Sequence, residues 1–286
     1  MFDVSIIIPV LNGSAFLGDT LRTVRTWLVS LHRPCEIVVV DDGSTDATPA
    51  ILREVTGGEA GAVPIDWLRR EVPIRWLRNE RNQGKGYSVR RGMLAAEGRN
   101  RVFMDADLTY PIECTRRVLE ALERGADVAI ADRMHPDSRY IVAPGFFRYL
   151  YTRHLMGRFF NLLVRTFVVP GIRDTQAGLK GFRREAVLDL FPRGNLPRFS
   201  FDVELLYVAQ RRGKRIEPVP ITFAYRKEPS TVRFLRDTVQ MLIDMARVRL
   251  RGIRGAYDRP LTPDPAPLPP PAAPATTPAP APGRSA

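Results

Sequence analysis

The chain has 286 residues, a hydrophobic content of 44% and a formal net charge of +12, which predicts a folded protein of one large domain or two small ones. No uncharged run approaches the roughly 18 apolar residues that a membrane-spanning helix needs, so we expect the chain not to cross a bilayer. The excess charge is mostly arginine and favours a polyanionic partner: nucleic acid, an anionic membrane surface or a phosphate-bearing substrate.

Five apolar, β-rich runs follow one another in the first half of the chain. They lie at residues 4–10, 36–42, 74–79, 101–107 and 127–133. The segments between the first four runs and after the last one read as helices, apart from a looser insertion at 55–73. Because the runs lack polar alternation and are separated by helices, they predict an α/β fold with a parallel sheet covered on both faces.

The chain changes character after Arg133. Residues 140–169 mix large apolar side chains with arginines, a further strand is predicted at 216–226, and a helical pattern runs from 231 to about 253. From Arg259 onward proline, alanine and threonine dominate, which predicts a disordered tail over 259–286.

The two cysteines give no sign of a zinc site or a disulfide framework. Cys35 falls in a predicted strand and Cys114 in a predicted helix, which favours a reducing cytoplasm. The chain opens directly on a strand, so we expect no signal peptide.

Each of the first four strands runs into a polar loop. The loops are PVLNG (9–13), DDGST (41–45), NQGKG (82–86) and DADLT (105–109). Either DDGST or NQGKG alone is more often a turn or a helix cap. Ligands bind outside the carboxyl ends of the strands in an open parallel sheet, so four such loops together favour a binding site.

The glycine spacing narrows the kind of nucleotide site. NQGKG lacks the upstream glycine and the following Ser or Thr of a Walker A loop, and strand one does not open into GxGxxG. We therefore expect no dinucleotide cofactor.

Asp105 and Asp107 come together at the end of the fourth strand, provided that the backbone turns at Ala106. Two carboxylates with no Lys or Arg beside them in the sequence repel each other, and a divalent cation relieves that repulsion. Hard oxygen ligands without His or Cys favour Mg²⁺ or Mn²⁺, shared with substrate phosphates.

These motifs, in this order, resemble the family-2 glycosyltransferases with the GT-A fold: SIIIPVLNG, EIVVVDDGSTDAT, NQGKGYSVRRG and VFMDADLTYPIE. The second half, with GIRDTQAGLKGFRREAV, RFSFDVELLYVAQRRG and IEPVPITFAYR, is similar to the branch that makes polyprenyl-phosphate sugars. Within that branch it most resembles the dolichyl-phosphate β-glucosyltransferases, with the mannose synthases as close relatives.

The resemblance implies a mixed, mainly parallel GT-A sheet and a role for particular residues. Asp41 and Asp42 would contact the nucleoside, Lys85 and Arg133 the phosphates, and Asp105 and Asp107 the metal. The implied catalytic set is Asp105, Asp107, Arg133, Asp202 and Glu204, and the implied donor-binding set is Pro9, Val10, Asn12, Asp41, Asp42, Lys85, Ala106, Gln176 and Arg233.

Three positions depart from the family pattern. Gly13 stands where an acidic residue often follows the asparagine, and Thr109 stands where mannose synthases tend to carry Gln. Near the end of the domain Arg233 takes the place of a lysine as a phosphate contact. The pattern therefore ranks UDP-glucose first as donor and GDP-mannose second.

The acceptor decides whether a general base is needed. A phosphate monoester is already largely dianionic at neutral pH, whereas a hydroxyl acceptor, as in cell-envelope polysaccharide synthesis, needs a base. Asp202 and Glu204 fit either that role or the N-terminal end of an amphipathic helix. A single displacement would invert the anomeric configuration.

A polyprenyl phosphate acceptor implies a peripheral protein on the cytoplasmic face of the membrane. Residues 140–169 and the basic amphipathic helix at 231–254 are the candidate interfacial segments; alternatively, their apolar faces belong to the core. The expected organisation is a glycosyltransferase domain over 1–230, divided into a nucleotide-sugar half (1–133) and an acceptor half (134–230). An interfacial helix (231–258) and the tail follow.

Two other protein classes share some of these features. A nucleotidyltransferase would carry a glycine-rich loop directly after strand one, where PVLNGSAFL has a single glycine. A nucleic-acid-binding protein would carry a recognition motif, and the sequence has no helix-turn-helix, zinc or RNP-like pattern, so we expect no nucleic-acid partner.

Overall fold

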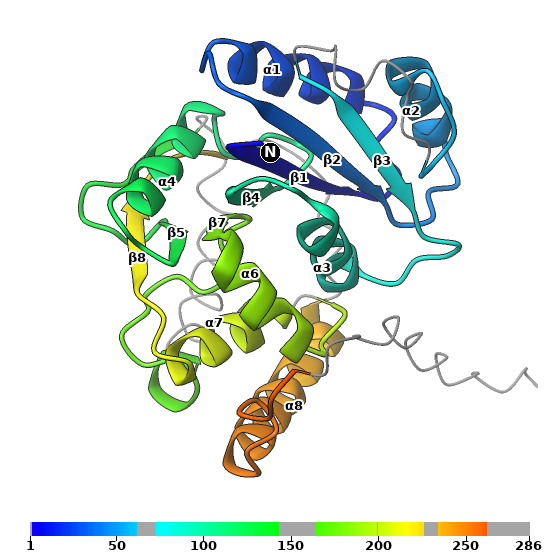
Figure 1. Ribbon diagram of the computed structural model, residues 1–286. Helices are drawn as coiled ribbons and strands as arrows, with labels where there is room; N and C mark the ends of the chain where they lie inside the picture. Colours follow the sequence, from blue (N-terminus) through cyan, green and yellow to red (C-terminus); the bar gives the residue numbers. More distant parts are fainter. Residues whose placement is uncertain (1, 62–71, 143–163, 199, 226–233, 262–286) are drawn as a thin grey trace, which may run out of the picture.

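The computed structural model describes residues 2–61, 72–142, 164–198, 200–225 and 234–261 (Figure 1). Its main feature is a seven-stranded sheet with the strand order β3-β2-β1-β4-β7-β5-β8, beside a two-stranded sheet of β6 and β9. The strands are β1 (Val4–Val10), β2 (Cys35–Asp41), β3 (Ile74–Arg78), β4 (Asn100–Met104), β5 (Val128–Asp132), β6 (Arg139–Val142), β7 (Leu179–Arg183), β8 (Ile216–Pro220) and β9 (Thr222–Tyr225).

Helices connect the strands along the chain. They are α1 (Leu17–Val29), α2 (Thr48–Thr56), α3 (Lys85–Ala95), α4 (Glu113–Glu123), α6 (Arg184–Leu190), the 3₁₀ turn η2 (Phe191–Arg193), α7 (Phe201–Arg211) and α8 (Phe234–Ile253). In α1 the buried residues Leu17, Leu21, Val24 and Leu28 recur at helical spacing and turn one stripe toward the sheet. Figure 1 shows α8 at the opposite end of the molecule from α1 and α2.

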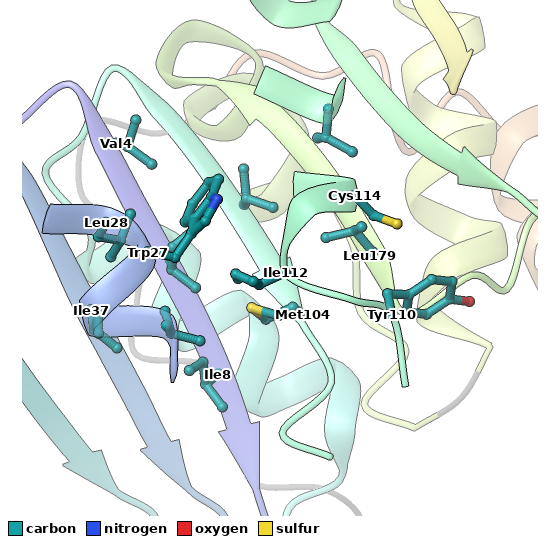
Figure 2. Packing of buried hydrophobic residues seen from close by; sticks show 14 of the residues in the cluster. Val4, Ile8, Trp27, Leu28, Ile37, Met104, Tyr110, Ile112, Cys114 and Leu179 are labelled. Carbon is teal, nitrogen blue, oxygen red and sulfur yellow. The ribbon is translucent and has the colours of Figure 1, made fainter. Parts of the chain in front are cut away.

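Two hydrophobic clusters pack on the two faces of the large sheet. Ile6 and Ile8 of β1 join α1 and α4 in one cluster, which Figure 2 shows around Trp27 and Met104. Ile7 faces the other way and joins α3, α6 and α7 in the second cluster. Alternate β1 residues thus serve opposite faces, which confirms the prediction of helices on both faces.

The sheet is mixed, because β7 runs antiparallel to its two neighbours. Met104 of β4 pairs with Leu179, and Ile130 of β5 pairs with Lys180. The other pairings, β1 with β2 and β4, β2 with β3 and β5 with β8, are parallel. The prediction of a mixed, mainly parallel sheet is confirmed, although the sequence reading identified no strand at β7.

The strand predicted at 216–226 is two strands rather than one. β8 ends at Pro220, Ile221 separates the two, and β9 leaves the large sheet to pair in parallel with β6. Pro218 and Pro220 lack the N–H that a ladder requires, which fits an edge position for β8.

The described part of the C-terminal segment is helical, as predicted, from Phe234 to Ile253. Arg233 and residues 262–286 lie outside the described residues, as does most of 140–169. No helix within the described ranges is both long enough and apolar enough to span a bilayer.

Candidate functional site

The carboxyl ends of β1, β2, β3, β4 and β5 lie at one edge of the large sheet, because these strands all run the same way. Pro9 and Val10 close β1, and Asp41 closes β2. The four loops predicted to meet at this edge follow directly from these strands, and hydrogen bonds join them to one another. The common direction of the strands therefore brings the four loops together at one edge of the sheet.

Asp41 is fully buried at the end of β2. Its Oδ1 accepts a hydrogen bond from the Ser44 amide at 2.9 Å, and its Oδ2 lies 3.4 Å from Arg78 Nε. That Oδ2 atom is buried and has no hydrogen-bond partner among the described residues. A buried acceptor without a donor is costly, which makes Asp41 suited to accept an N–H group from a ligand.

Asp42 holds the loop that follows β3. Its Oδ1 accepts hydrogen bonds from Asn79 Nδ2 at 2.7 Å and from the Gln83 amide at 2.9 Å, and its Oδ2 accepts one from the Gly84 amide at 2.8 Å. The carboxylate is thus occupied by three donors from residues 79–84, and it orients the NQGKG loop.

Hydrogen bonds join the loop after β1 (9–13) to the loop after β2 (41–45). The Asn12 amide donates to Ser44 Oγ at 2.8 Å, and Asn12 Oδ1 accepts from the Thr45 amide at 2.9 Å. Asp46 accepts the amides of Ser14 and Thr48. Burial opposes the charged form of Asp46, but these hydrogen bonds outweigh it and hold the pKa of this carboxyl well below its usual range.

Lys85, the first residue of α3, reaches across to the end of β4. Its Nζ donates to Asp105 Oδ1 at 2.5 Å. Burial disfavours the ammonium, but Asp105, Asp202 and Asp107 together outweigh that effect and raise the pKa of Lys85. The sequence offered no Lys or Arg beside the two aspartates; the fold supplies Lys85 from a distant loop.

The chain turns immediately after β4, as predicted, and presents two carboxylates on the turn. The Asp105 amide donates to the Gly178 carbonyl at 3.1 Å, and the Ala106 carbonyl accepts from Thr20 Oγ1 at 2.6 Å. Asp107 Oδ1 accepts from the amide and the hydroxyl of Thr109 at 2.9 and 2.5 Å. Leu108, between Asp107 and Thr109, adopts a left-handed φ of 51°.

Arg133 follows β5 and is held by a carboxylate from the second half of the chain. Its Nε and Nη2 donate to Asp174 Oδ2 and Oδ1 at 2.7 and 2.9 Å, and its amide donates to Oδ2 at 3.0 Å. Burial raises the pKa of Asp174, but the Arg133 guanidinium outweighs it and keeps that pKa below its usual value. Gln176 lies two residues on, with its amide directed at Asp174 Oδ1 at 3.3 Å.

Asp202 forms a buried ion pair with Lys180, 2.6 Å from its Nζ, which also donates to the Ala177 carbonyl. Burial raises the pKa of Asp202, against the opposing effects of Lys180 and Lys85, and burial likewise lowers the pKa of Lys180. Asp202 therefore lies within electrostatic reach of Lys85 and Asp105, with its charge already matched by Lys180.

Glu204 belongs to a different environment from the other candidates. It is 1% exposed, and its two oxygens accept hydrogen bonds from the amides of Asn195 and Leu196 and from the hydroxyl of Tyr257. Its contacts are thus with a loop, with Arg251 at the end of α8 and with the segment after α8, and the carboxylate is not among the groups at the strand ends.

The donor set at the β4 turn fits a hard divalent cation. Asp105 and Asp107 each have an oxygen that makes no hydrogen bond among the described residues, and hard oxygen pairs of this kind hold Mg²⁺ together with phosphate oxygens. Within the described ranges no group of three or more His, Cys, Asp or Glu could hold a metal ion. This edge of the sheet supplies two carboxylates for a metal ion, and the phosphates of a bound ligand would supply the remaining oxygens.

Sequence reasoning passed over the residues that position this site. Asp174 and Gly178 lie in GIRDTQAGLKGFRREAV, and the sequence prediction gave neither of them a role. The structure shows that Asp174 pairs with Arg133, a candidate phosphate-binding residue 41 positions earlier in the chain. Asn79 and Lys180 were missed because their partners lie far along the chain.

The family model described as "Glycosyl transferase family 2" matches residues 5–191. The chain is 34% identical to the dolichyl-phosphate beta-glucosyltransferase of Drosophila melanogaster, over 89% of this chain and 77% of that protein. It is 28% identical to the protein of the same name in Dictyostelium discoideum, over 88% of this chain and 76% of that one.

A solved structure with a similar fold is glucosyl-3-phosphoglycerate synthase from Mycobacterium tuberculosis in complex with UDP. The TM-score is 0.55 at 18% identity, covering 91% of this chain and 82% of that one. The same protein was solved with Mn²⁺, UDP and glucosyl-3-phosphoglycerate, at a TM-score of 0.52 and 17% identity over the same shares of each chain. At these identities the likeness concerns the fold.

Proposed function

The chain belongs to glycosyl transferase family 2, and from that premise we propose that it moves glucose from UDP-glucose to a membrane polyprenyl phosphate with inversion at the anomeric carbon. The observation that carries the proposal is the contact between Lys85 and Asp105 at the carboxyl edge of the sheet. This contact brings Lys85, the proposed phosphate-binding cation, next to Asp105, the proposed metal-binding carboxylate. The names of the curated relatives support the choice of glucose and of a lipid phosphate.

The donor's diphosphate would lie between two cations. Lys85 comes from the N-terminus of α3, and Arg133 comes from the end of β5, where Asp174 fixes its guanidinium. Negative charge builds on the leaving oxygen as the nucleoside diphosphate departs, and preorganised cations stabilise that charge. Asp174 thus acts on the reaction through Arg133.

Asp105 and Asp107 would hold Mg²⁺ or Mn²⁺ on the diphosphate. When bound, the cation neutralises the phosphates and stabilises the leaving group. The neighbours in the fold comparison include complexes of one protein with Mn²⁺ or Mg²⁺ and UDP, which supports the choice of ion. Thr109 fixes Asp107, and the Gly178 carbonyl fixes the backbone of Asp105.

The nucleoside would lie against the ends of β1 and β2. Asp41 would accept an N–H of the base through its Oδ2, which accepts no hydrogen bond among the described residues, with Pro9, Val10 and Asn12 alongside. Asp42 would act indirectly, because its oxygens already accept three hydrogen bonds from residues 79–84.

The acceptor needs no general base. A phosphate monoester is largely dianionic at neutral pH, so its oxygen can attack the anomeric carbon directly while the bond to the nucleoside diphosphate breaks. An α-linked donor then gives a β-linked product. Asp202, which is paired with Lys180, and Gln176 would line the sugar and acceptor side.

The acceptor is reached at a membrane surface, and we assign that contact to α8. Its exposed side includes Leu242, Ile243, Leu250 and Ile253, together with Arg247 and Arg249, and the exposed Arg254 follows directly after the helix. Apolar and basic side chains on one exposed helix are typical of an interfacial helix drawn to anionic lipid. This arrangement supports a peripheral protein; the cytoplasmic face, a catalytic domain over 1–230 and an interfacial helix over 231–258 complete the proposal.

The test is a panel of sugar nucleotides, including UDP-glucose and GDP-mannose, offered with polyprenyl phosphate and Mg²⁺ or Mn²⁺. Mass spectrometry of the lipid fraction identifies the product. We expect a hexosyl lipid with UDP-glucose, no product after chelation, and none with Asp105→Asn, which should keep its fold. A product only with GDP-mannose, or full activity of Asp105→Asn, would contradict the proposal.

A further inference from the structure

A single buried carboxylate joins α7, the loop before it and the segment after α8. Glu204 Oε2 accepts the amides of Asn195 and Leu196 at 2.7 and 2.8 Å, while Oε1 accepts Tyr257 Oη at 2.8 Å and lies 3.4 Å from Arg251 Nη1. The side chain is 1% exposed. Because both oxygens are in use, neither partner segment can move without breaking a hydrogen bond to a buried charge.

The loop held by Oε2 supports the residues on either side of Lys85. The Tyr87 amide donates to the Pro197 carbonyl at 3.0 Å, and a Cβ on Gly84 would lie 2.5 Å from that same oxygen. A Cβ on Gly86 would meet the Leu196 carbonyl at 2.8 Å and the Phe201 side chain at 2.6 Å. The backbone on both sides of Lys85 therefore rests directly on Leu196, Pro197 and Phe201.

The partners at Oε1 belong to the end of α8 and the turn that follows. Arg251 lies in the last turn of α8, with its guanidinium 5.0 Å from the centre of the Tyr257 ring. The two residues contact Glu204 together, and a Cβ on Gly252 would meet Tyr207 Oη at 2.0 Å. The end of α8 is thus packed against α7 around this carboxylate.

We propose that Glu204 is a positioning residue that sets the donor-binding lysine, Lys85, by fixing the 194–198 loop against the end of α8. The inference rests on the proposed function for the role of Lys85, and it adds a connection from α8 to the donor site. Glu204 touches no reacting group; it acts through the Pro197 carbonyl and the backbone of residues 84–87.

The contact between Glu204 and the end of α8 bears on how tightly the donor binds. A loop held in one place by α8 presents Lys85 to the diphosphate without further ordering, which strengthens donor binding. If the contact with Glu204 is lost, Lys85 is still present, but the backbone of residues 84–87 is no longer held in one position. The donor KM should therefore rise, while the KM for the acceptor changes little.

Four variants separate the connection from general stability. Tyr257→Phe removes one hydrogen bond at Oε1 and leaves the loop contacts, whereas Glu204→Ala removes both sides. Asp258→Asn is the matched control, because Asp258 pairs the same post-α8 segment with Arg211 of α7 but does not contact Glu204. Glu204→Gln keeps one oxygen that can accept the Asn195 and Leu196 amides.

Two readouts are compared, the donor KM for UDP-glucose in the transfer assay and hydrogen exchange of the peptide spanning 84–88, measured by mass spectrometry. Losing a hydrogen bond to a charged group is worth about tenfold in an equilibrium. We expect about a tenfold rise in donor KM for Glu204→Ala, about threefold for Tyr257→Phe, an intermediate effect for Glu204→Gln, and less than twofold for Asp258→Asn. Exchange at 84–88 should accelerate in the same order, while β1 stays protected.

The inference is overturned if Tyr257→Phe and Asp258→Asn behave alike, or if exchange at 84–88 is unchanged in every variant. Should Glu204→Ala fail to fold, Tyr257→Phe still decides the matter. If the wild-type chain transfers no glucose, the proposed function has failed. The exchange measurement needs no substrate, so it still tests the link between Glu204 and the Lys85 loop.

Discussion

A Cβ atom on Gly178 would lie 1.9 Å from Asp105 Oδ2, closer than any side chain could be accommodated. The two residues also share a backbone hydrogen bond, from the Asp105 amide to the Gly178 carbonyl. The carboxylate at the end of β4 therefore lies directly against the backbone that enters β7. The position of Asp105 depends on the absence of a side chain at residue 178.

Gly178→Ala should displace the Asp105 carboxylate and lower the transfer rate by about 100-fold or more, since misplacement by about 1 Å is enough for such a loss. Gly18→Ala in α1 is the control, because a Cβ there meets nothing within 4 Å. It should leave transfer unchanged and raise stability by up to about 1 kcal/mol. The measurements are the transfer rate and thermal unfolding, and a fully active Gly178→Ala enzyme would remove this account of Asp105.

Thr109→Val should weaken the binding of the divalent cation, because it removes the hydroxyl that holds Asp107 while the backbone contact stays. Loss of an outer contact to a metal ligand commonly costs about tenfold or more in metal affinity. A titration of the transfer rate with Mg²⁺ should therefore shift to about tenfold higher concentration.

Thr115→Val is the matched control, since the Thr115 hydroxyl is buried in α4 and has no partner among the described residues. Its Mg²⁺ titration should coincide with that of the wild type. An equal shift in both variants would mean that the effect does not pass through Asp107.

Asp174→Asn should destabilise the protein by about 3 kcal/mol at pH 7, because it removes the buried carboxylate charge that pairs with the Arg133 guanidinium. The pKa of Asp174 is lower in the folded state than in the unfolded state. Its contribution is therefore fully present above about pH 4 and is lost as the pH falls through the folded pKa. Urea unfolding at several pH values should give a difference between wild type and variant that shrinks below about pH 4.

Asp19→Asn serves as the control for this measurement. Asp19 pairs with Arg22 on the exposed side of α1, where both side chains are more than 70% exposed, so its removal should change stability by no more than about 1 kcal/mol at any pH. A difference between wild type and Asp174→Asn that stays constant from pH 7 to pH 3 would contradict the assignment.

Replacing Arg249 and Arg254 by Gln should weaken association with anionic vesicles by about 2 kcal/mol, since each basic residue near such a surface contributes about 1 kcal/mol. The matched control is the pair Arg22→Gln and Arg25→Gln, which removes the same charge from α1 at the other end of the molecule (Figure 1). Co-sedimentation at several salt concentrations measures the effect. Equal losses for both pairs, or no dependence on lipid charge, would argue against α8 as the docking helix.

Strand positions and the ligand edge could be predicted from the sequence because they depend on local patterns. The run at 36–42 has no polar alternation and became a buried strand, Cys35–Asp41. Strand β7 escaped detection because LKGFR carries Lys180 and Gly181 where a buried strand usually has apolar residues. Lys180 is tolerated there only because Asp202, from a helix further along the chain, neutralises it.

The roles of individual carboxylates were harder to predict than their presence. Asp41 and Asp42 are neighbours in the sequence with the same expected function, yet Asp41 keeps a buried oxygen that accepts no hydrogen bond among the described residues, whereas both oxygens of Asp42 accept hydrogen bonds from residues 79–84. Asp202 and Glu204 also differ, because Asp202 pairs with Lys180 whereas Glu204 accepts hydrogen bonds from two backbone amides and a tyrosine hydroxyl. These differences arise from contacts across many residues, which spacing alone does not encode.

The reversed direction of β7 has a consequence for how the chain is able to vary. The polypeptide leaves the large sheet at Asp132 and re-enters it at Leu179, and both points lie on the ligand edge. The described parts of the intervening segment, residues 133–142 and 164–178, therefore begin and end at the edge where we propose that the donor binds. Insertions or deletions there can reshape the acceptor side of the enzyme while the register of every strand in the sheet stays the same.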